Sequence, residues 1–265
     1  MQLQGSTALL TGASGGIGRA IARALDARGA SVVLTARSTG RLEQLAAALG
    51  DRPRVLTADL AAARGAAELA ERAGAVDVLV ANAALPASGP IDDFTPEQID
   101  RALDVNLRAP IQLARALVPG MVERGGGHVV LVSSLSGKLA SVGSSLYSAG
   151  KFGLRGFAAG LREDLHGTGV GVTVVFPGFI SDAGMLADSG VRLPRWVGTR
   201  KPEQVADAVV KGIEDGRREI DVAPLSLRAG VFAGSLAPAT VARIQRRLGS
   251  AELSNAIARG QRAKR

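Results

Sequence analysis

The sequence of 265 residues contains no cysteine, one tyrosine, one tryptophan and two histidines. The absence of cysteine excludes a disulfide framework and a thiol nucleophile, so cysteine usage gives no information about the compartment. His128 falls at the start of a strand-like run and His166 at the end of a helix-like one, without a spacing typical of metal ligands. We therefore expect no metal site.

Long apolar runs and linkers are also missing from the sequence. No run approaches the about 20 apolar residues that span a bilayer. The N-terminal stretch MQLQGSTALLTG lacks the basic region and the small-residue cleavage site of a signal peptide. No Pro/Gly/Ser-rich or charged segment divides the chain, and 46% of its residues are hydrophobic. We therefore expect one globular domain in the cytoplasm.

Acidic residues are scarce at the C-terminal end. The segment 241–265 holds seven basic residues and one acidic residue, which accounts for +6 of the net charge of +8. A basic amphipathic tail can bind RNA or anionic lipid, but a solvated terminal helix that frays explains the same pattern. We expect that solvated helix and no nucleic-acid partner, and membrane contact by the tail remains the alternative.

Short β-branched runs alternate with Ala/Leu-rich segments of helical periodicity. Between the runs, apolar residues recur at spacings of three and four, as in GRAIARALDARG (18–29) and RLEQLAAALG (41–50). Strands that are apolar on both faces and joined by helices favour a parallel sheet covered on both sides. The sequence thus predicts an α/β doubly wound fold with ligands at the carboxyl ends of its strands. The expected strands are TALLT (7–11), SVVLT (31–35), RVLT (54–57), VDVLVA (76–81), HVVLVS (128–133), GVTVVF (171–176) and EIDVA (219–223).

The first expected strand runs into the glycine-rich stretch TGASGGIG, residues 11–18. Its Gly12, Gly16 and Gly18 lie between a strand and a helix. There glycine permits a tight turn and lets a diphosphate approach the amide groups of the helix N-terminus. The spacing differs from the common G-x-G-x-x-G, but the strand and helix around it indicate a dinucleotide site.

The second strand ends in Ala36 and Arg37, where a site that prefers NAD usually has an acid that holds the ribose hydroxyls. An arginine at this place accommodates a 2′-phosphate, with Ser38 as a second phosphate ligand. The alternative is that Arg37 is one more exposed arginine in a basic protein. We infer NADP as the cofactor.

The single tyrosine, Tyr147, stands four residues before Lys151 in the stretch YSAGK, and both residues share one face of the predicted helix. A phenol has a pKa near 10, and a neighbouring ammonium lowers it. Ser133 and Ser134, at the end of the run VVLVSS, offer hydroxyls that can hold a substrate oxygen, and Ser136 is a further candidate. This set suggests proton transfer coupled to hydride transfer.

Together these stretches resemble the short-chain dehydrogenase/reductase family, the single-domain NAD(P)-dependent oxidoreductases. The resemblance extends to about Ala223 and implies a Rossmann-type sheet of about seven parallel strands. It rests on TGASGGIG, ADL (58–60), ANAA (81–84), DVNL (104–107), VSS (132–134), YSAGK and PG (177–178), in the family's order and spacing.

The sequence departs from the family's pattern at three places. ANAA replaces the usual NNAG, Ser181 stands where threonine usually follows PGFI, and the glycine-rich stretch lacks the basic residue of some NADP-preferring members. The expectation of NADP(H) rather than NAD(H) therefore depends mainly on Arg37.

The resemblance implies a role for each matching residue. Tyr147 is the implied general acid in reduction and general base in oxidation. Lys151 lowers the pKa of Tyr147 and binds the nicotinamide ribose, Ser134 orients the substrate oxygen, and Asn106 holds a water of the proton relay. With Tyr147 and Lys151, the implied cofactor-binding residues are Gly12, Ser14, Gly15, Gly16, Ile17, Gly18, Arg37, Ser38, Asp59, Leu60, Asn82, Ala83, Pro177, Gly178 and Ile180.

The substrate is less determined. In this family the segment corresponding to about 178–200 forms a lid, and here it combines Met185, Leu186, Leu193 and Trp196 with two arginines, Arg192 and Arg195. Such a lid suits a hydrophobic carbonyl or alcohol, and ordinary lid packing explains it equally well. We expect residues 1–223 to form the NAD(P)-binding domain with its lid. Residues 224–265 form a helical extension of the same domain that caps the pocket, pairs subunits or touches a membrane.

The sequence therefore predicts an NADP-dependent oxidoreductase that interconverts a carbonyl and a secondary alcohol of an apolar small molecule, as a homodimer or homotetramer. The alternative is a catalytically quiet NADP-binding protein whose basic tail recruits a partner or a membrane.

Overall fold

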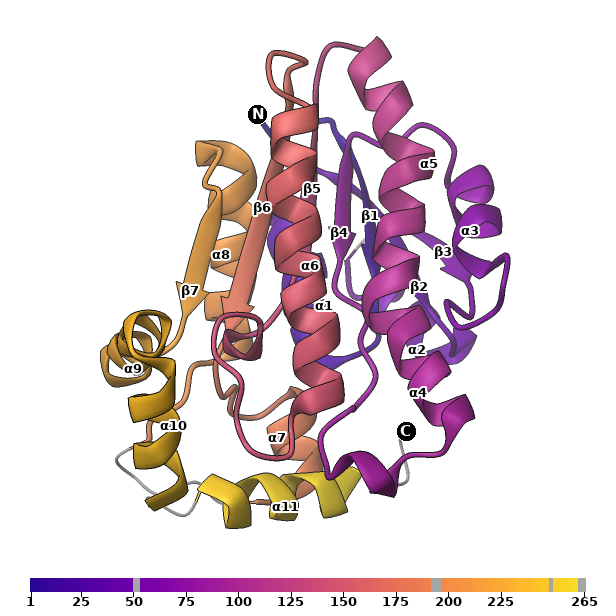
Figure 1. Ribbon diagram of the computed structural model, residues 1–265. Coiled ribbons are helices and arrows are strands. Elements are labelled where there is room, and N and C mark those ends of the chain that lie inside the picture. The colour runs from indigo at the N-terminus through magenta and orange to yellow at the C-terminus, as the bar shows by residue number, and fades with distance from the viewer. Residues whose placement is uncertain (50–52, 192–196, 248–249, 262–265) are drawn as a thin grey trace.

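The computed structural model describes residues 1–49, 53–191, 197–247 and 250–261. A seven-stranded parallel sheet forms its centre, in the order β3-β2-β1-β4-β5-β6-β7 (Figure 1). This confirms the predicted doubly wound fold, and each expected run contains a strand. The strands are β1 (Thr7–Thr11), β2 (Ser31–Ala36), β3 (Arg54–Thr57), β4 (Val78–Ala81), β5 (Gly127–Val132), β6 (Val170–Pro177) and β7 (Glu219–Val222).

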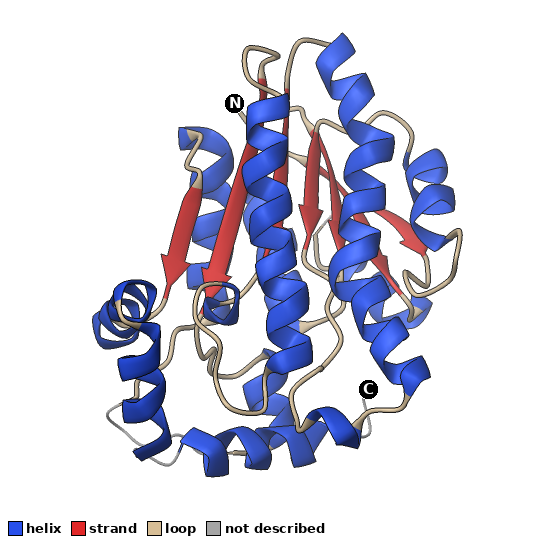
Figure 2. Ribbon diagram, viewed as in Figure 1, coloured by secondary structure: helices blue, strands red, loops and turns tan. Residues whose placement is uncertain are grey.

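Helices cover both faces of the sheet, as the apolar strands require (Figure 2). One face packs against α1 (Gly16–Ala27), α2 (Thr39–Ala47) and α8 (Pro202–Asp215), and the other against α3 (Gly65–Ala73), α5 (Ala109–Glu123) and α6 (Ser145–Asp164). Leu9 and Leu10 illustrate the alternation: these neighbours on β1 are fully buried in the two different cores.

The chain reverses direction across the sheet at β1. It runs outward through β2 and β3 and then returns to place β4 on the other side of β1. In such sheets the crevice outside the carboxyl ends of the strands on either side of the reversal is the ligand site. Short elements follow β4 and β5 near this edge: η1 (Ile91–Asp93), α4 (Pro96–Leu103), the π-helical η2 (Asp104–Arg108) and η3 (Leu135–Gly137).

The C-terminal extension forms three helices, α9 (Leu225–Leu236), α10 (Pro238–Arg247) and α11 (Ser250–Gln261). Helix α11 packs against the short lid helix α7 (Gly184–Ser189) below the carboxyl edge of the sheet (Figure 1). Ala258 and Gln261 are buried there. The expectation of a solvated terminal helix is therefore wrong for α11, because a lid helix covers one of its faces.

Some sequence expectations lie outside the described residues. They concern Arg192, Leu193, Arg195 and Trp196 of the lid, and the last four residues of the basic tail, 262–265. Within the part of the chain that the structure does describe, no helix is both long and apolar enough to cross a lipid bilayer.

Candidate active site

A large cavity of about 1450 Å³ lies at the carboxyl edge of the sheet. Its volume exceeds the roughly 300–1,000 Å³ of a typical small-molecule pocket, so it has room for a dinucleotide and a second molecule. The expected cofactor-binding residues all line it, as does Ser134; Asn106 does not. Those cofactor-binding residues are Gly12, Ser14, Gly15, Gly16, Ile17, Gly18, Arg37, Ser38, Asp59, Leu60, Asn82, Ala83, Tyr147, Lys151, Pro177, Gly178 and Ile180.

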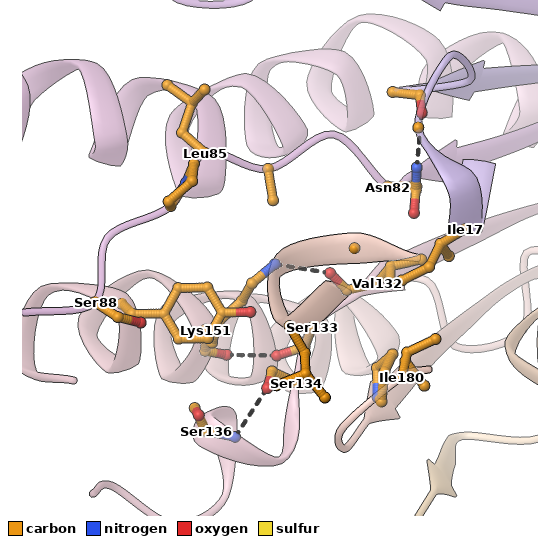
Figure 3. Close-up of a pocket in the computed structure, with 18 of the residues that line it drawn as sticks. Ile17, Asn82, Leu85, Ser88, Val132, Ser133, Ser134, Ser136, Lys151 and Ile180 are labelled. Atoms are coloured by element: carbon orange, nitrogen blue, oxygen red, sulfur yellow. Dashed lines mark hydrogen bonds between the residues drawn. The ribbon is translucent and has the colours of Figure 1, made fainter. Parts of the chain in front are cut away.

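The glycine-rich turn after β1 is held in shape by the turn after β4. Gly12 has a φ of 67°, and a Cβ there would lie 2.8 Å from the Cα of Ala83. The Nδ2 of Asn82 donates to the carbonyl oxygens of Thr11 at 3.0 Å and Gly12 at 3.3 Å, and Figure 3 shows Asn82 on this side of the cavity. The sequence ANAA therefore keeps the asparagine that ties the two turns together.

The N-terminus of α1 faces the same cavity. Its N-cap is Gly15, which has no side chain that could cap the helix, and its first turn, Gly16–Arg19, contains no acidic residue. Free amide groups and the positive end of the helix dipole attract an anion. The turn is therefore fit to bind the diphosphate of a dinucleotide.

Three polar residues line the cavity just beyond β2. Arg37 and Ser38 are exposed, and Arg41, one turn into the following helix, lies beside them on the cavity wall. Sequence reasoning missed Arg41, although a second basic residue shortly after the strand was a signal that could have found it. Arg101 of α4 also lines this end, with its Nη2 3.9 Å from an oxygen of Asp59.

Lys151 is a buried lysine that points along α6 toward the end of β5. Its side chain is 2% exposed, and its Nζ donates to the carbonyl oxygen of Val132 at 3.0 Å (Figure 3). Burial lowers the pKa of Lys151 to about 8. The ammonium therefore remains largely protonated at pH 7.

Tyr147 lies one turn before Lys151, and the Nζ of Lys151 is 5.7 Å from the centroid of its ring. The amide of Tyr147 donates to the carbonyl oxygen of Ala87 at 3.1 Å, which fixes the first turn of α6. Burial raises the pKa of the Tyr147 phenol, and a hydrogen bond with Ser134 lowers it. The pKa of Tyr147 is therefore raised overall. The resemblance implies the opposite direction, because it assigns Lys151 the role of lowering the pKa of Tyr147.

The three serines that follow β5 differ in their hydrogen-bond partners. The Oγ of Ser133 donates to the carbonyl oxygen of Lys151 at 3.0 Å, so this hydroxyl supports α6. Ser134 is the N-cap of η3, where its Oγ accepts from the amide of Ser136 at 3.2 Å (Figure 3). Its hydroxyl also interacts with the phenol of Tyr147. Ser134 is therefore the hydroxyl paired with the phenol.

Asn106 sits in the π-helical turn between α4 and α5. Its side chain is buried and makes both of its hydrogen bonds to the backbone of Leu85: the Oδ1 accepts at 2.7 Å and the Nδ2 donates at 3.0 Å. A π-helical turn inside a helix often marks a functional site. The side chain itself holds the segment after β4 and does not face the cavity.

The far end of the cavity is built by the C-terminal extension, for which the sequence left three alternative roles open. Helices α9, α10 and α11 supply Ser226, Leu227, Gly230, Val231, Val241, Ile244, Ser254, Ile257 and Gln261. Among the alternatives for the extension, the structure thus places it at the pocket. The sequence held no motif for this contact, because it joins residues far apart along the chain.

A parallel doubly wound sheet with a glycine-rich turn, a serine after β5 and a tyrosine–lysine pair on α6 defines a nucleotide-dependent oxidoreductase. The family profile described as short chain dehydrogenase matches residues 6–191. The chain therefore belongs to the short-chain dehydrogenase/reductase family, which confirms the resemblance. It is an enzyme, an NAD(P)-dependent oxidoreductase acting on CH–OH groups.

Three similar proteins illustrate the relationship. Ketoacyl reductase HetN of Nostoc sp. is 37% identical over 259 residues, which cover 93% of this chain and 90% of HetN. A short-chain dehydrogenase from Sphingobium yanoikuyae, solved in complex with NADPH, is 30% identical with a TM-score of 0.77, covering 87% of this chain and 93% of that one. A metagenomic short-chain oxidoreductase in complex with NADP is 33% identical with a TM-score of 0.69, covering 84% and 98%.

Proposed function

We propose that the protein is an NADP-dependent enzyme that interconverts a carbonyl and a secondary alcohol of an apolar small molecule, with Tyr147 as the acid and base. The observation that carries this proposal is the hydrogen-bonded pair of Ser134 and Tyr147 beside the buried ammonium of Lys151. The relatives named above are reductases, dehydrogenases and oxidoreductases, and they do not favour the alternative of a quiet binding protein.

In the proposed reduction, a nicotinamide held near Lys151, Gly178 and Ile180 would supply the hydride for the carbonyl carbon. The Tyr147 hydroxyl gives its proton to the substrate oxygen, while Ser134 donates a hydrogen bond that keeps this oxygen in place. The proton transfer leaves a phenolate next to the Lys151 ammonium, which stabilises the negative charge. In the oxidation direction, the phenolate takes the proton from the alcohol.

Asn106 takes part in this scheme through the backbone. Because both polar groups of its side chain are bonded to Leu85, we expect any relay water to be held by main-chain groups of the π-helical turn. The side chain acts as a positioning group, which fixes the segment that leads to Ala87 and so to the amide of Tyr147.

The proposed preference for NADP depends on the basic group after β2. Arg37, Ser38 and Arg41 offer two guanidinium groups and a hydroxyl at the cavity edge, where an acid would bind the ribose of NAD. Two of the solved relatives were determined with NADPH or NADP. The homodimer or homotetramer, the cytoplasmic location and the apolar substrate remain predictions.

The test compares wild type with Tyr147→Phe. Titration with NADPH and with NADH, followed by cofactor fluorescence, should show tighter binding of NADPH in both proteins. Turnover of a ketone should fall by about two to four orders of magnitude in the variant, because the proton donor is lost and the ring is kept. Comparable turnover in the two proteins would refute the assignment of Tyr147.

A further inference from the structure

We propose that helices α9, α10 and α11 form a compartment that binds a neutral aliphatic chain of the substrate. The compartment extends the cavity beyond Ser134 and Tyr147. This inference rests on the proposed function, because the aliphatic chain must be attached to the carbonyl or alcohol group that reacts beside Ser134 and Tyr147. The lid sequence alone suggested an apolar substrate but named neither the residues nor the shape of the group.

The walls of the compartment are uncharged and mostly aliphatic, with Ser226, Ser254 and Gln261 as the polar members from these helices. Among the described residues that α9, α10 and α11 contribute to the cavity, none is charged and none is aromatic. The exposed arginines of these helices, Arg228, Arg243, Arg246, Arg247 and Arg259, do not line it. The aliphatic residues at this end are Leu139, Leu186, Val197, Leu227, Val231, Val241, Ile244 and Ile257.

Helix α9 shows how the helical repeat places some side chains on the cavity wall and others outside it. Leu227 and Val231 are four residues apart and share the face that lines the cavity. Phe232, the next residue after Val231, points away and is 67% exposed. Neighbouring residues on a helix are about 100° apart, so one helix offers both a wall residue and a matched outward residue.

Close contacts at glycines fix α9 and α11 around the cavity. A Cβ on Gly234 of α9 would lie 2.5 Å from the Cδ1 of Leu139, in the segment after η3. A Cβ on Gly260 of α11 would lie 2.5 Å from the carbonyl oxygen of Ser189, at the end of the lid helix α7. The extension therefore joins the two segments that flank the catalytic serine and the lid, and it closes the cavity from below.

The chemistry of these walls selects the ligand. Without a cation, the described walls cannot pair with a phosphate or carboxylate, and without an aromatic ring they offer no stacking surface. A saturated chain gains affinity by leaving water, by about fourfold for each methylene that is fully buried. We therefore infer specificity for an alkyl or acyl chain next to the reacting carbon.

The experiment measures reduction of unbranched methyl ketones, from butanone through hexanone and octanone to decanone, with NADPH. In wild type, kcat/KM should rise with chain length by up to about fourfold per methylene until the compartment is full. Val231→Trp fills the compartment and should lower kcat/KM for decanone by at least about tenfold while butanone is unchanged. Phe232→Trp, the outward neighbour, is the matched control and should behave as wild type.

A second readout does not depend on turnover. Calorimetric titration with the corresponding secondary alcohols, in the presence of NADPH, which cannot oxidise them, should show tighter binding of longer alcohols in wild type and a loss of this trend in Val231→Trp. A flat dependence on chain length in both assays, or an equal loss for butanone and decanone in Val231→Trp, would overturn the compartment. Length-dependent binding without any turnover would support the compartment and refute the proposed function instead.

Discussion

The Nζ of Lys151 lies 5.7 Å from the centroid of the Tyr147 ring and donates to the carbonyl oxygen of Val132 at 3.0 Å. This relationship depends on two different levels of structure. The spacing of four residues places both side chains on one face of α6, whereas the carbonyl that receives the ammonium belongs to β5. An ammonium held in this way is costly to bury, and the cost can be measured.

Replacement of Lys151 by methionine should separate stability from activity. Burial lowers the pKa of Lys151 from 10.5 to about 8, and a lowered pKa means that the folded state disfavours the charged form that is present at pH 7. Lys151→Met removes the buried charge and should raise the free energy of unfolding, by on the order of 1 kcal/mol after the loss of the Val132 hydrogen bond. Turnover should be lost.

Urea unfolding at pH 7 checks the first effect, and Lys211→Met, on the exposed part of α8, is the control with little expected change. If Lys151→Met unfolds at lower urea than wild type, the hydrogen bond to Val132 outweighs the cost of burial.

The two arginines beyond β2 should determine the choice of cofactor. Arg37→Ala and Arg41→Ala should each weaken NADPH binding by about tenfold, because each removes a charged ligand of the 2′-phosphate, and should leave NADH binding unchanged. Arg23→Ala changes an exposed arginine of α1 that does not line the cavity and serves as the control. An equal loss of NADPH and NADH would assign the arginines a general electrostatic effect.

Gly18 should tolerate no side chain. A Cβ there would overlap the carbonyl oxygen of Gly12 and lie 2.8 Å from the Cα of Ala13, both backbone atoms of the phosphate-binding turn. We expect Gly18→Ala to weaken binding of NADPH and of NADH, and to lower the thermal midpoint. Gly40→Ala is the matched control, because nothing lies within 4 Å of its Cβ. This change should stabilise the protein by about 0.5–1 kcal/mol; comparable midpoints for both variants would contradict the steric argument.

His128 should make the fold sensitive to acid. It is buried against Thr173, with its Nε2 2.8 Å from the Oγ1, and burial lowers the pKa of His128 from 6.5 to about 4. The unfolded chain therefore binds a proton at a pH where the folded protein does not, so stability falls as the pH decreases from about 6.5 to 4. The loss from this one residue approaches about 3 kcal/mol at pH 4.

Urea unfolding at several pH values tests this assignment. His128→Gln should flatten the decline in stability between pH 6.5 and 4, and His166→Gln, at an exposed position, should keep it. An unchanged slope in His128→Gln would show that other groups cause the sensitivity.

The positions of the strands along the chain and the location of the cofactor turn could be predicted from the sequence, because both depend on local patterns. Apolar runs of strand length and a glycine-rich turn between a strand and a helix act through neighbouring residues. The spacing within YSAGK has the same local character, since a helix repeats every 3.6 residues. Where only local geometry was needed, as for the pairing of Tyr147 with Lys151, the prediction and the structure agree.

The parts that needed distant segments could only be decided by the tertiary structure. Ser133 and Ser134 cannot be told apart in the sequence. In the structure, the hydroxyl of Ser133 donates to the carbonyl oxygen of Lys151, whereas the hydroxyl of Ser134 interacts with Tyr147. The basic C-terminal segment also needed the tertiary structure. Its charge predicted a solvated helix, because the sequence gives the charge of a segment but not the surface against which it packs. Contact between α11 and α7 joins segments about 70 residues apart, and no periodicity along the chain records which surfaces will meet.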